Sequence, residues 1–175
     1  MITPRLETER LILRCFQDDD ISAVYNGWET DPDVAKYMMW ESHNDIEKTR
    51  AWIADEICNI AKDDWYRWAL IKKETEELIG TCLIYYSDEE SSYVVGYNLS
   101  KKFWGNGYTT EAMKRVLEFA RNDLGLKLIT GSHSVENPAS GKVMEKIGMV
   151  YNQDCNYVCN GGKIRTKGKS YKIEF

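Results

Sequence analysis

Apolar residues at every second position mark the expected strands of this chain. Leu11, Leu13 and Cys15 follow this spacing near the start, which predicts a first β-strand. In the middle of the chain, β-branched and aromatic residues are concentrated in runs that charged turns separate, as is typical of hairpins. The expected strands there are Trp65–Lys73, Leu78–Tyr86 and Ser92–Leu99, and later strands are expected at Leu126–Ser134, Met149–Val158 and Ser170–Phe175.

Helical spacing of apolar residues predicts two long helices. One is expected from Asp45 to Lys62, with Ile46, Ile53 and Ile57 on one side. The other begins at Tyr108, and its apolar positions are Ala112, Met113, Val116, Leu117 and Ala120.

Two shorter helices are indicated by their ends. The acidic run Asp18-Asp19-Asp20 supplies negative charge where a helix starts. Asn137 followed by Pro138 is a good helix start, and Gly148 is a good helix end. A series of hairpins followed by a strand–helix–strand–helix unit predicts an α/β (α+β) fold with a mixed, mostly antiparallel sheet. The length of 175 residues fits one domain, residues 1–175.

A glycine turn joins the strand at Ser92–Leu99 to the helix that begins at Tyr108, and its sequence is Phe103-Trp104-Gly105-Asn106-Gly107. Glycine reaches positive φ easily, so backbone N–H groups can converge on an anion in front of a helix start. A G-x-G pattern alone also fits an ordinary turn. Thr110 stands where a dinucleotide-binding motif has its third glycine, so NAD is not expected to bind.

These motifs together resemble the GNAT superfamily of acetyl-CoA-dependent N-acetyltransferases, in its RimJ/RimL-like branch. The segment from Val95 to Ala112 and the Asn137-Pro138-Ala139-Ser140 run carry most of the likeness. The opening Leu6–Arg14 and the closing Lys169–Ile173 match the same branch, so the resemblance spans nearly the whole chain. It implies a sheet with helices on both faces, in which two splayed strands hold acetyl-CoA.

The resemblance also implies roles for individual residues. The oxyanion would be held by a main-chain N–H near Asn98 or Leu99. Asn137 would bond the pantetheine arm, although capping of its helix is an alternative, and Ser140 would reach the arm or the thiol. The pyrophosphate would lie against the turn and the helix start, at Trp104, Gly105, Asn106, Gly107, Tyr108, Thr109 and Thr110.

Two positions depart from the family pattern. Met144 replaces the tyrosine that many members use as general acid, so Ser140, a water or a tyrosine from elsewhere must protonate the thiolate, or it leaves unassisted. Val94 replaces a glutamate that Rim-type enzymes often carry, so the general base is unassigned. The lack of an assigned general base favours an α-amine as acceptor, because an α-amine is partly neutral at pH 7 and a lysine-type amine is not.

The expected function is therefore transfer of acetyl from acetyl-CoA to a primary amine. A protein N-terminus is the first choice of acceptor, and a small amine such as a polyamine, an amino acid or an antibiotic is the second. A catalytically silent CoA-binding regulatory module is the alternative. Core packing is an equally good explanation for each residue expected to line the acceptor side, namely Tyr37, Trp40, Tyr85 and Tyr97.

Composition limits the partners. The net charge of −5 disfavours nonspecific nucleic-acid binding and suits a cationic substrate. The last sixteen residues carry five Lys or Arg against one Glu, and they are expected to form a solvated edge strand. The five irregularly spaced cysteines indicate neither a disulfide framework nor a zinc site, so no metal is expected. No signal peptide or membrane span is recognised, so a cytoplasmic protein is expected, and a homodimer stays open.

Overall fold

The computed structural model describes all residues from 1 to 175, and its strands form one eight-stranded sheet in the order β1-β2-β3-β4-β5-β6-β8-β7. Neighbouring strands are antiparallel except β5 and β6, which are parallel. The strands are β1 (Leu6–Glu7), β2 (Leu11–Arg14), β3 (Trp65–Lys72), β4 (Glu77–Ser87), β5 (Ser92–Leu99), β6 (Leu128–Ser134), β7 (Val150–Cys159) and β8 (Ile164–Glu174).

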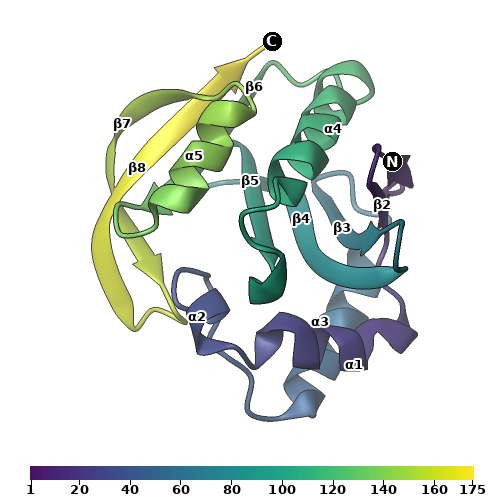
Figure 1. Cartoon of the computed structure of the whole chain (residues 1–175). Coiled ribbons are helices and arrows are strands. Elements are labelled where there is room, and N and C mark those ends of the chain that lie inside the picture. Colours follow the sequence, from purple (N-terminus) through teal and green to yellow (C-terminus); the bar gives the residue numbers. More distant parts are fainter.

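Helices cover both faces of this sheet, as expected. In Figure 1, α4 and α5 lie together at one end of the molecule, and α1, α2 and α3 lie together at the other. None of the helices combines the length and apolar character that a membrane crossing requires. The helices are α1 (Ile21–Val24), α2 (Pro32–Ala35), α3 (Ile46–Asn59), α4 (Tyr108–Asn122) and α5 (Pro138–Lys146), with short helical turns η1 (Asp18–Asp20), η2 (Tyr25–Glu29) and η3 (Lys101–Phe103).

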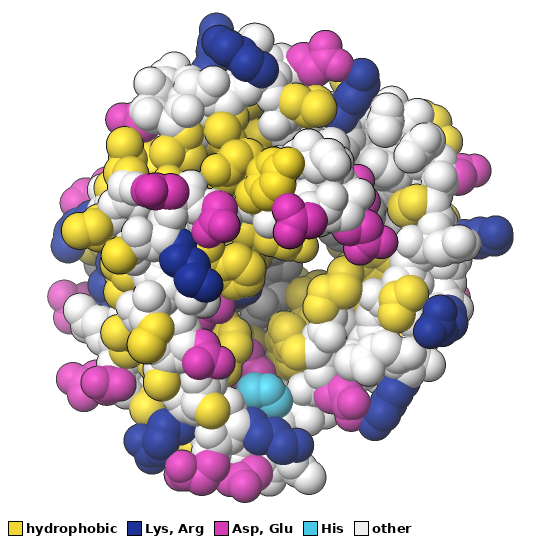
Figure 2. Space-filling model, turned by 180° about the vertical axis from the view of Figure 1, so that it is seen from behind, with side chains coloured by type: hydrophobic (Ala, Val, Ile, Leu, Met, Phe, Trp, Pro, Cys, Tyr) yellow, Lys and Arg dark blue, Asp and Glu magenta, His cyan; other side chains and the backbone are white.

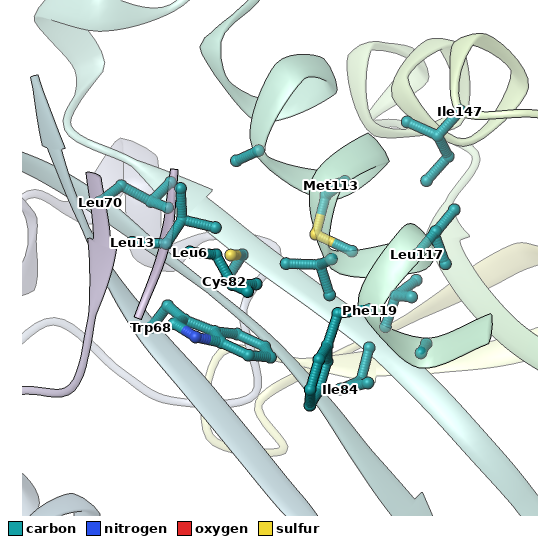
Figure 3. Close-up of a cluster of buried hydrophobic side chains, with 14 of the residues drawn as sticks. Leu6, Leu13, Trp68, Leu70, Cys82, Ile84, Met113, Leu117, Phe119 and Ile147 are labelled. Atoms are coloured by element: carbon teal, nitrogen blue, oxygen red, sulfur yellow. The ribbon is translucent and has the colours of Figure 1, made fainter. Parts of the chain in front are cut away.

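Alternate residues of β3 belong to two different hydrophobic clusters. Trp68 packs edge-on against Phe119 of α4, with ring centroids 5.7 Å apart, in the cluster drawn in Figure 3. Ala69, one residue further along, instead belongs to the cluster under α1 and α3, with Trp28 and Ile53. Successive side chains of a strand point to opposite faces, so β3 divides the core into an α4/α5 face and an α1/α3 face.

The sheet opens between β5 and β6. Only two residue pairs join these strands, Tyr93 with Ile129 and Val94 with Thr130. The rest of β5, from Val95 to Leu99, pairs with β4 alone. The strands therefore splay toward the end of β5 that leads into the glycine turn.

The basic segment at the end of the chain is not an edge strand, so that prediction was wrong. β8 runs from Ile164, six residues before the predicted start, and lies between β6 and β7. The edge strand at this end of the sheet is β7, whose side chains are mostly exposed. The segment before Ser170 was missed because the residues at its alternate positions are lysines, an arginine and small residues, which carry little apolar signal.

Other boundaries differ by a few residues. The predicted helix at residues 45–62 is α3 and ends at Asn59, and the strand expected from Leu126 is β6 and begins at Leu128. The acidic run at 18–20 forms the 3₁₀ turn η1, and the short helix α1 begins directly after it at Ile21. After α1, the chain passes into the π-helical turn η2, a form that often marks functional sites and has no simple sequence pattern.

Candidate active site

A cavity of about 330 Å³ lies where β5 and β6 splay. The end of β5, the glycine turn, the start of α4 and one side of α5 enclose it. The residues that line it are Met38, Tyr97, Asn98, Leu99, Phe103, Trp104, Gly105, Gly107, Tyr108, Thr109, Thr110, Asn137, Ala139, Ser140, Lys142, Val143 and Lys146. The structure thus brings the two sequence motifs, which lie about thirty residues apart, to one site.

The glycine turn has the backbone that an anion nest requires. Gly105 and Gly107 have φ of 77° and 78°, in the left-handed region that glycine adopts without strain. Gly107 directly precedes α4, and no side chain caps the helix N-terminus there. The first amides of α4 therefore remain free for a ligand, and the helix dipole adds to their attraction for a phosphate.

Arg10 and Glu111 hold this turn in place, a role that the sequence did not reveal. Arg10 donates from Nη1 to the carbonyl of Asn106 at 3.1 Å, and its guanidinium lies over the Tyr108 ring at 4.4 Å. Glu111 in turn accepts from the Arg10 Nε at 2.6 Å, from the Arg10 backbone and from the Thr8 hydroxyl. The one sequence signal for this contact was Glu111, an acid in the first turn of α4. Its partner Arg10 lies about a hundred residues earlier in the chain.

Asn137 is free to bind a ligand. It occupies the N-cap position of α5, but its side chain makes no capping hydrogen bond. The turn is held by backbone contacts instead, from Asn137 N to the Ser134 carbonyl at 2.9 Å and from Ser140 N to the Asn137 carbonyl at 3.2 Å. Capping and ligand binding therefore do not compete for this amide.

Tyr97 and Ser140 form a hydrogen-bonded pair inside the cavity. The Tyr97 hydroxyl lies 2.9 Å from the Ser140 carbonyl, to which it donates, and 3.0 Å from the Ser140 Oγ. Burial raises the pKa of the Tyr97 phenol, although the bond to Ser140 lowers it in part. The phenol thus stays protonated near neutral pH. Tyr97 thus supplies a tyrosine to the cavity from β5, whereas Met144 occupies the position on α5 where many family members have one.

The end of β5 offers main-chain and side-chain donors. Ser100 N donates to the Ile79 carbonyl of β4, and strand amides alternate in direction, so the Asn98 amide points to β4 and the Leu99 amide into the splay. Leu99 is therefore the better placed of the two residues expected to supply a main-chain oxyanion donor. Asn98 is among the residues that line the cavity, and its buried Nδ2 has no hydrogen-bonded partner.

One residue of the predicted phosphate turn lies outside the cavity. Asn106 does not line the cavity, since its side chain bonds the carbonyls of Phe103 and Trp104. Trp104 lines it with its indole N–H on the Leu99 carbonyl at 2.9 Å. Lys102, two residues before Trp104, is paired with Glu77 and does not line the cavity.

The predicted acceptor-side residues divide between two places. Tyr97 lies in the cavity against Ser140, whereas Tyr85 lies on the α1/α3 face, paired across the strands with Trp65 at 5.2 Å between ring centroids. Tyr37 and Trp40 belong to the segment after α2 and do not line the cavity, although Met38 between them does. The Tyr157 hydroxyl of β7 donates to the Tyr37 carbonyl at 2.9 Å and ties this segment to the β7–β8 hairpin.

Comparison with known proteins identifies the class. The sequence profile of the Acetyltransferase (GNAT) domain matches residues 10–150. The uncharacterized N-acetyltransferase p20 of Bacillus licheniformis is 32% identical over 143 residues, which cover 81% of this chain and 80% of that protein. The chain belongs to the GNAT family of acetyltransferases, and it is an acetyl-CoA-dependent N-acetyltransferase.

Solved structures agree with this assignment. An acetyltransferase of the GNAT family from Bacillus anthracis superposes with a TM-score of 0.84 at 26% identity, covering 98% of both chains. RimL, a ribosomal L7/L12 α-N-protein acetyltransferase solved with coenzyme A, superposes with a TM-score of 0.84 at 15% identity, covering 100% of this chain and 98% of its own. The fold is thus the one found in the RimL-like members of the family.

Proposed function

We propose that this enzyme acetylates the α-amine of a protein or peptide N-terminus. One observation carries the proposal: no aspartate, glutamate or histidine is among the residues that line the cavity. A site without a strong base beside the thioester suits an amine that is already partly neutral. An α-amine with a pKa of about 7.7–8.0 meets that condition, whereas a lysine-type amine near 10.4 would have to lose a proton at a cost of roughly 4–5 kcal/mol. The fold shared with RimL, an α-N-protein acetyltransferase, supports the same choice.

The residues of the cavity fit the other demands of the reaction. The open glycine turn and the start of α4 would hold the pyrophosphate of acetyl-CoA, and Asn137 would bond its pantetheine arm. The Leu99 amide, with the unpartnered Asn98 side chain beside it, would stabilise the oxyanion that forms when the amine attacks. Tyr97, hydrogen-bonded to Ser140, would give its proton to the departing thiolate.

A panel of acceptors at saturating acetyl-CoA tests the proposal. It comprises peptides that begin with alanine, serine or methionine, the same peptides with a blocked N-terminus and an internal lysine, spermidine, free amino acids and an aminoglycoside. We expect kcat/KM for at least one free N-terminus to exceed that for every other amine by about tenfold or more, as the difference in deprotonation cost requires. Turnover confined to the small amines would move the enzyme to the second acceptor class. Binding of acetyl-CoA without turnover of any amine would indicate the silent CoA-binding module.

A further inference from the structure

A buried cluster of charged side chains lies on the α1/α3 face of the sheet, outside the cavity. Arg67 of β3 pairs with Glu56 of α3 at 2.9 Å, and Glu56 also accepts from the Trp65 indole at 2.8 Å. Glu29, at the end of the π-helical turn η2, has only 4% of its side chain exposed, and its Oε2 lies 3.1 Å from the His43 Nε2. Burial of so many charges is costly unless each has a partner or a task.

Glu29 is the acid of this cluster that has no Lys or Arg partner. Glu56 pairs with the Arg67 cation and accepts from the Trp65 indole, whereas the contact of Glu29 is the His43 imidazole. The Trp28 Nε1, Glu29 Oε2 and Arg67 Nε atoms are buried without a well-aligned hydrogen bond, although Arg67 Nε lies 2.9 Å from Glu56 Oε1 and Glu29 Oε2 lies 3.1 Å from His43 Nε2. A buried carboxyl without a Lys or Arg partner is suited to a cation from outside or to a proton.

The cluster and the end of β5 share one face of the sheet. Arg67 pairs across the strands with Leu83 and so with Gly96, while Ala69 pairs with Thr81 and so with Asn98. Cross-strand partners point to the same face, so the Asn98 side chain and Arg67 project to the same side. The segment that carries His43 also carries Met38, which lines the cavity. Figure 2 shows that the side of the molecule turned away from the viewer in Figure 1 is hollowed, with hydrophobic and acidic side chains around the hollow.

We propose that Glu29, supported by His43, binds the charged ammonium group of the acceptor on this face and takes its proton. This inference rests on the proposed acetyl transfer to a primary amine and names the subsite for that amine. One N–H bond of the ammonium breaks and its proton passes to the Glu29 carboxylate. The products are the neutral amine, which attacks the thioester, and a carboxylic acid, which returns the proton to solvent after turnover.

The surroundings of Glu29 suit this exchange. Burial raises its pKa to about 7, while Trp28 and the charge of Arg67 lower it in part, and burial together with the charge of Lys48 lowers the pKa of His43. Both shifts favour the uncharged forms, so a proton can be gained or lost near neutral pH. The His43 Nδ1 lies 2.8 Å from the Thr49 hydroxyl, which fixes the ring while its Nε2 faces Glu29. Glu56 remains the counter-ion of Arg67 throughout.

The pKa of Glu29 also bears on the choice of amine. A proton acceptor near 7 lies within about one unit of an α-amine but more than three units below a lysine-type amine. The subsite would therefore deprotonate an N-terminus readily and a side-chain amine poorly. This agrees with the absence of a base in the cavity itself.

Direct binding of a small ammonium probe tests the subsite without any turnover. The probe is n-butylammonium, titrated calorimetrically into the protein with CoA present, and n-butanol and tetramethylammonium are the controls without charge and without N–H. We expect n-butylammonium to bind more tightly as the pH rises through 7, when Glu29 ionises, and both controls to bind more weakly. Glu29→Gln should weaken the probe about tenfold or more and remove the pH dependence, as loss of one charged hydrogen bond predicts.

Glu56→Gln is the matched control, because it alters a buried acid of the same cluster that already has its partners. It should bind the probe within about twofold of the unsubstituted protein, the scatter expected for a residue without direct contact. Equal binding by Glu29→Gln, equal weakening by both variants, or no binding to the unsubstituted protein would each overturn the inference. Probe binding that depends on Glu29, in an enzyme that acetylates no N-terminus, would leave the subsite standing and refute the proposed acceptor.

Discussion

In the proposed mechanism, the hydrogen-bonded pair of Tyr97 and Ser140 passes a proton to the leaving thiolate. Their hydroxyl oxygens lie 3.0 Å apart on elements that are separated by 43 residues in sequence. Tyr97→Phe should lower kcat by on the order of tenfold to a thousandfold, the range that a positioned acid supplies, and leave the KM for acetyl-CoA nearly unchanged. Single-turnover kinetics with the preferred acceptor would measure this loss.

Ser140→Ala and the double variant separate a working pair from two independent residues. If the two hydroxyls act together, the double variant should be no slower than the slower single variant. Multiplying losses would show two independent contributions, and full turnover in Tyr97→Phe would remove the phenol from the mechanism.

The Asn137 side chain makes no hydrogen bond to α5, so we propose that it binds acetyl-CoA and does not cap the helix. Asn137→Ala should raise the KM for acetyl-CoA and change the free energy of unfolding by less than about 0.5 kcal/mol. The matched control is Asp45→Ala, because the Asp45 carboxylate accepts from Glu47 N at 3.0 Å at the start of α3. That variant should lose about 1 kcal/mol of stability in urea denaturation without any change in KM. The reverse pattern would restore capping as the role of Asn137.

Glu29 should make stability fall as pH rises. Its pKa lies near 7 in the folded state against an ordinary value of 4.5, so between these values the folded protein binds more protons than the unfolded chain. The resulting loss of stability is complete above pH 7 and reaches up to roughly 3 kcal/mol. Glu29→Gln should therefore gain stability relative to the unsubstituted protein between pH 5 and pH 8 in urea denaturation.

Glu111 should give the opposite pH dependence of stability, and it serves as the control. Burial raises its pKa, but hydrogen bonds from Thr8 and Arg10 outweigh burial and hold the pKa below its ordinary value. Its contribution is present at neutral pH and is lost as pH falls through the folded pKa, so Glu111→Gln should lose more stability at pH 8 than at low pH. The same pH trend in both variants would contradict these assignments.

At the scale of the elements, the role of the glycine turn before α4 in phosphate binding can be separated from the backbone strain that a substitution there creates. Gly107 and Gly125 have φ of 78° and 65°, and neither has a close neighbour that a Cβ would clash with. Valine at either position should cost about 1–2 kcal/mol of stability, because a branched residue resists the left-handed region. Only Gly107→Val should also weaken CoA binding by about tenfold or more, since Gly125 lies in the loop after α4, away from the cavity. Equal CoA affinity in both variants would place the phosphate nest elsewhere.

The elements that sequence predicted well are those with strong local signals. The strands around Leu70 and Ile84 and the helix α4 follow from apolar periodicity, and the turn at Gly105 and Gly107 follows from its glycines. β8 was placed too late because Arg165, Lys167 and Lys169 alternate with Thr166 and Gly168, which carry little apolar signal. Its position inside the sheet is a property of topology, which no local pattern contains.

At the scale of the whole molecule, what sequence could not supply is the set of contacts between distant segments. The resemblance placed Asn137, Ser140 and the glycine turn in one cleft, and the structure brings them together. The clamp of Arg10 on Glu111 depends on how separate elements pack. So does the cluster that joins Glu29 of η2 to Arg67 of β3. Residues whose partners lie far along the chain carry no periodic or spacing signal, and these residues adjust the chemistry of the site.

Acetyl transfer to an α-amine is the main proposal for this enzyme. The most direct measurement is tandem mass spectrometry of one peptide that carries both a free N-terminal alanine and an internal lysine, after incubation with enzyme and acetyl-CoA. We expect a single acetyl group on the N-terminal nitrogen, formed at a rate that falls in Tyr97→Phe. An acetyl group on the lysine side chain, or a peptide left unmodified while spermidine is acetylated, would contradict it.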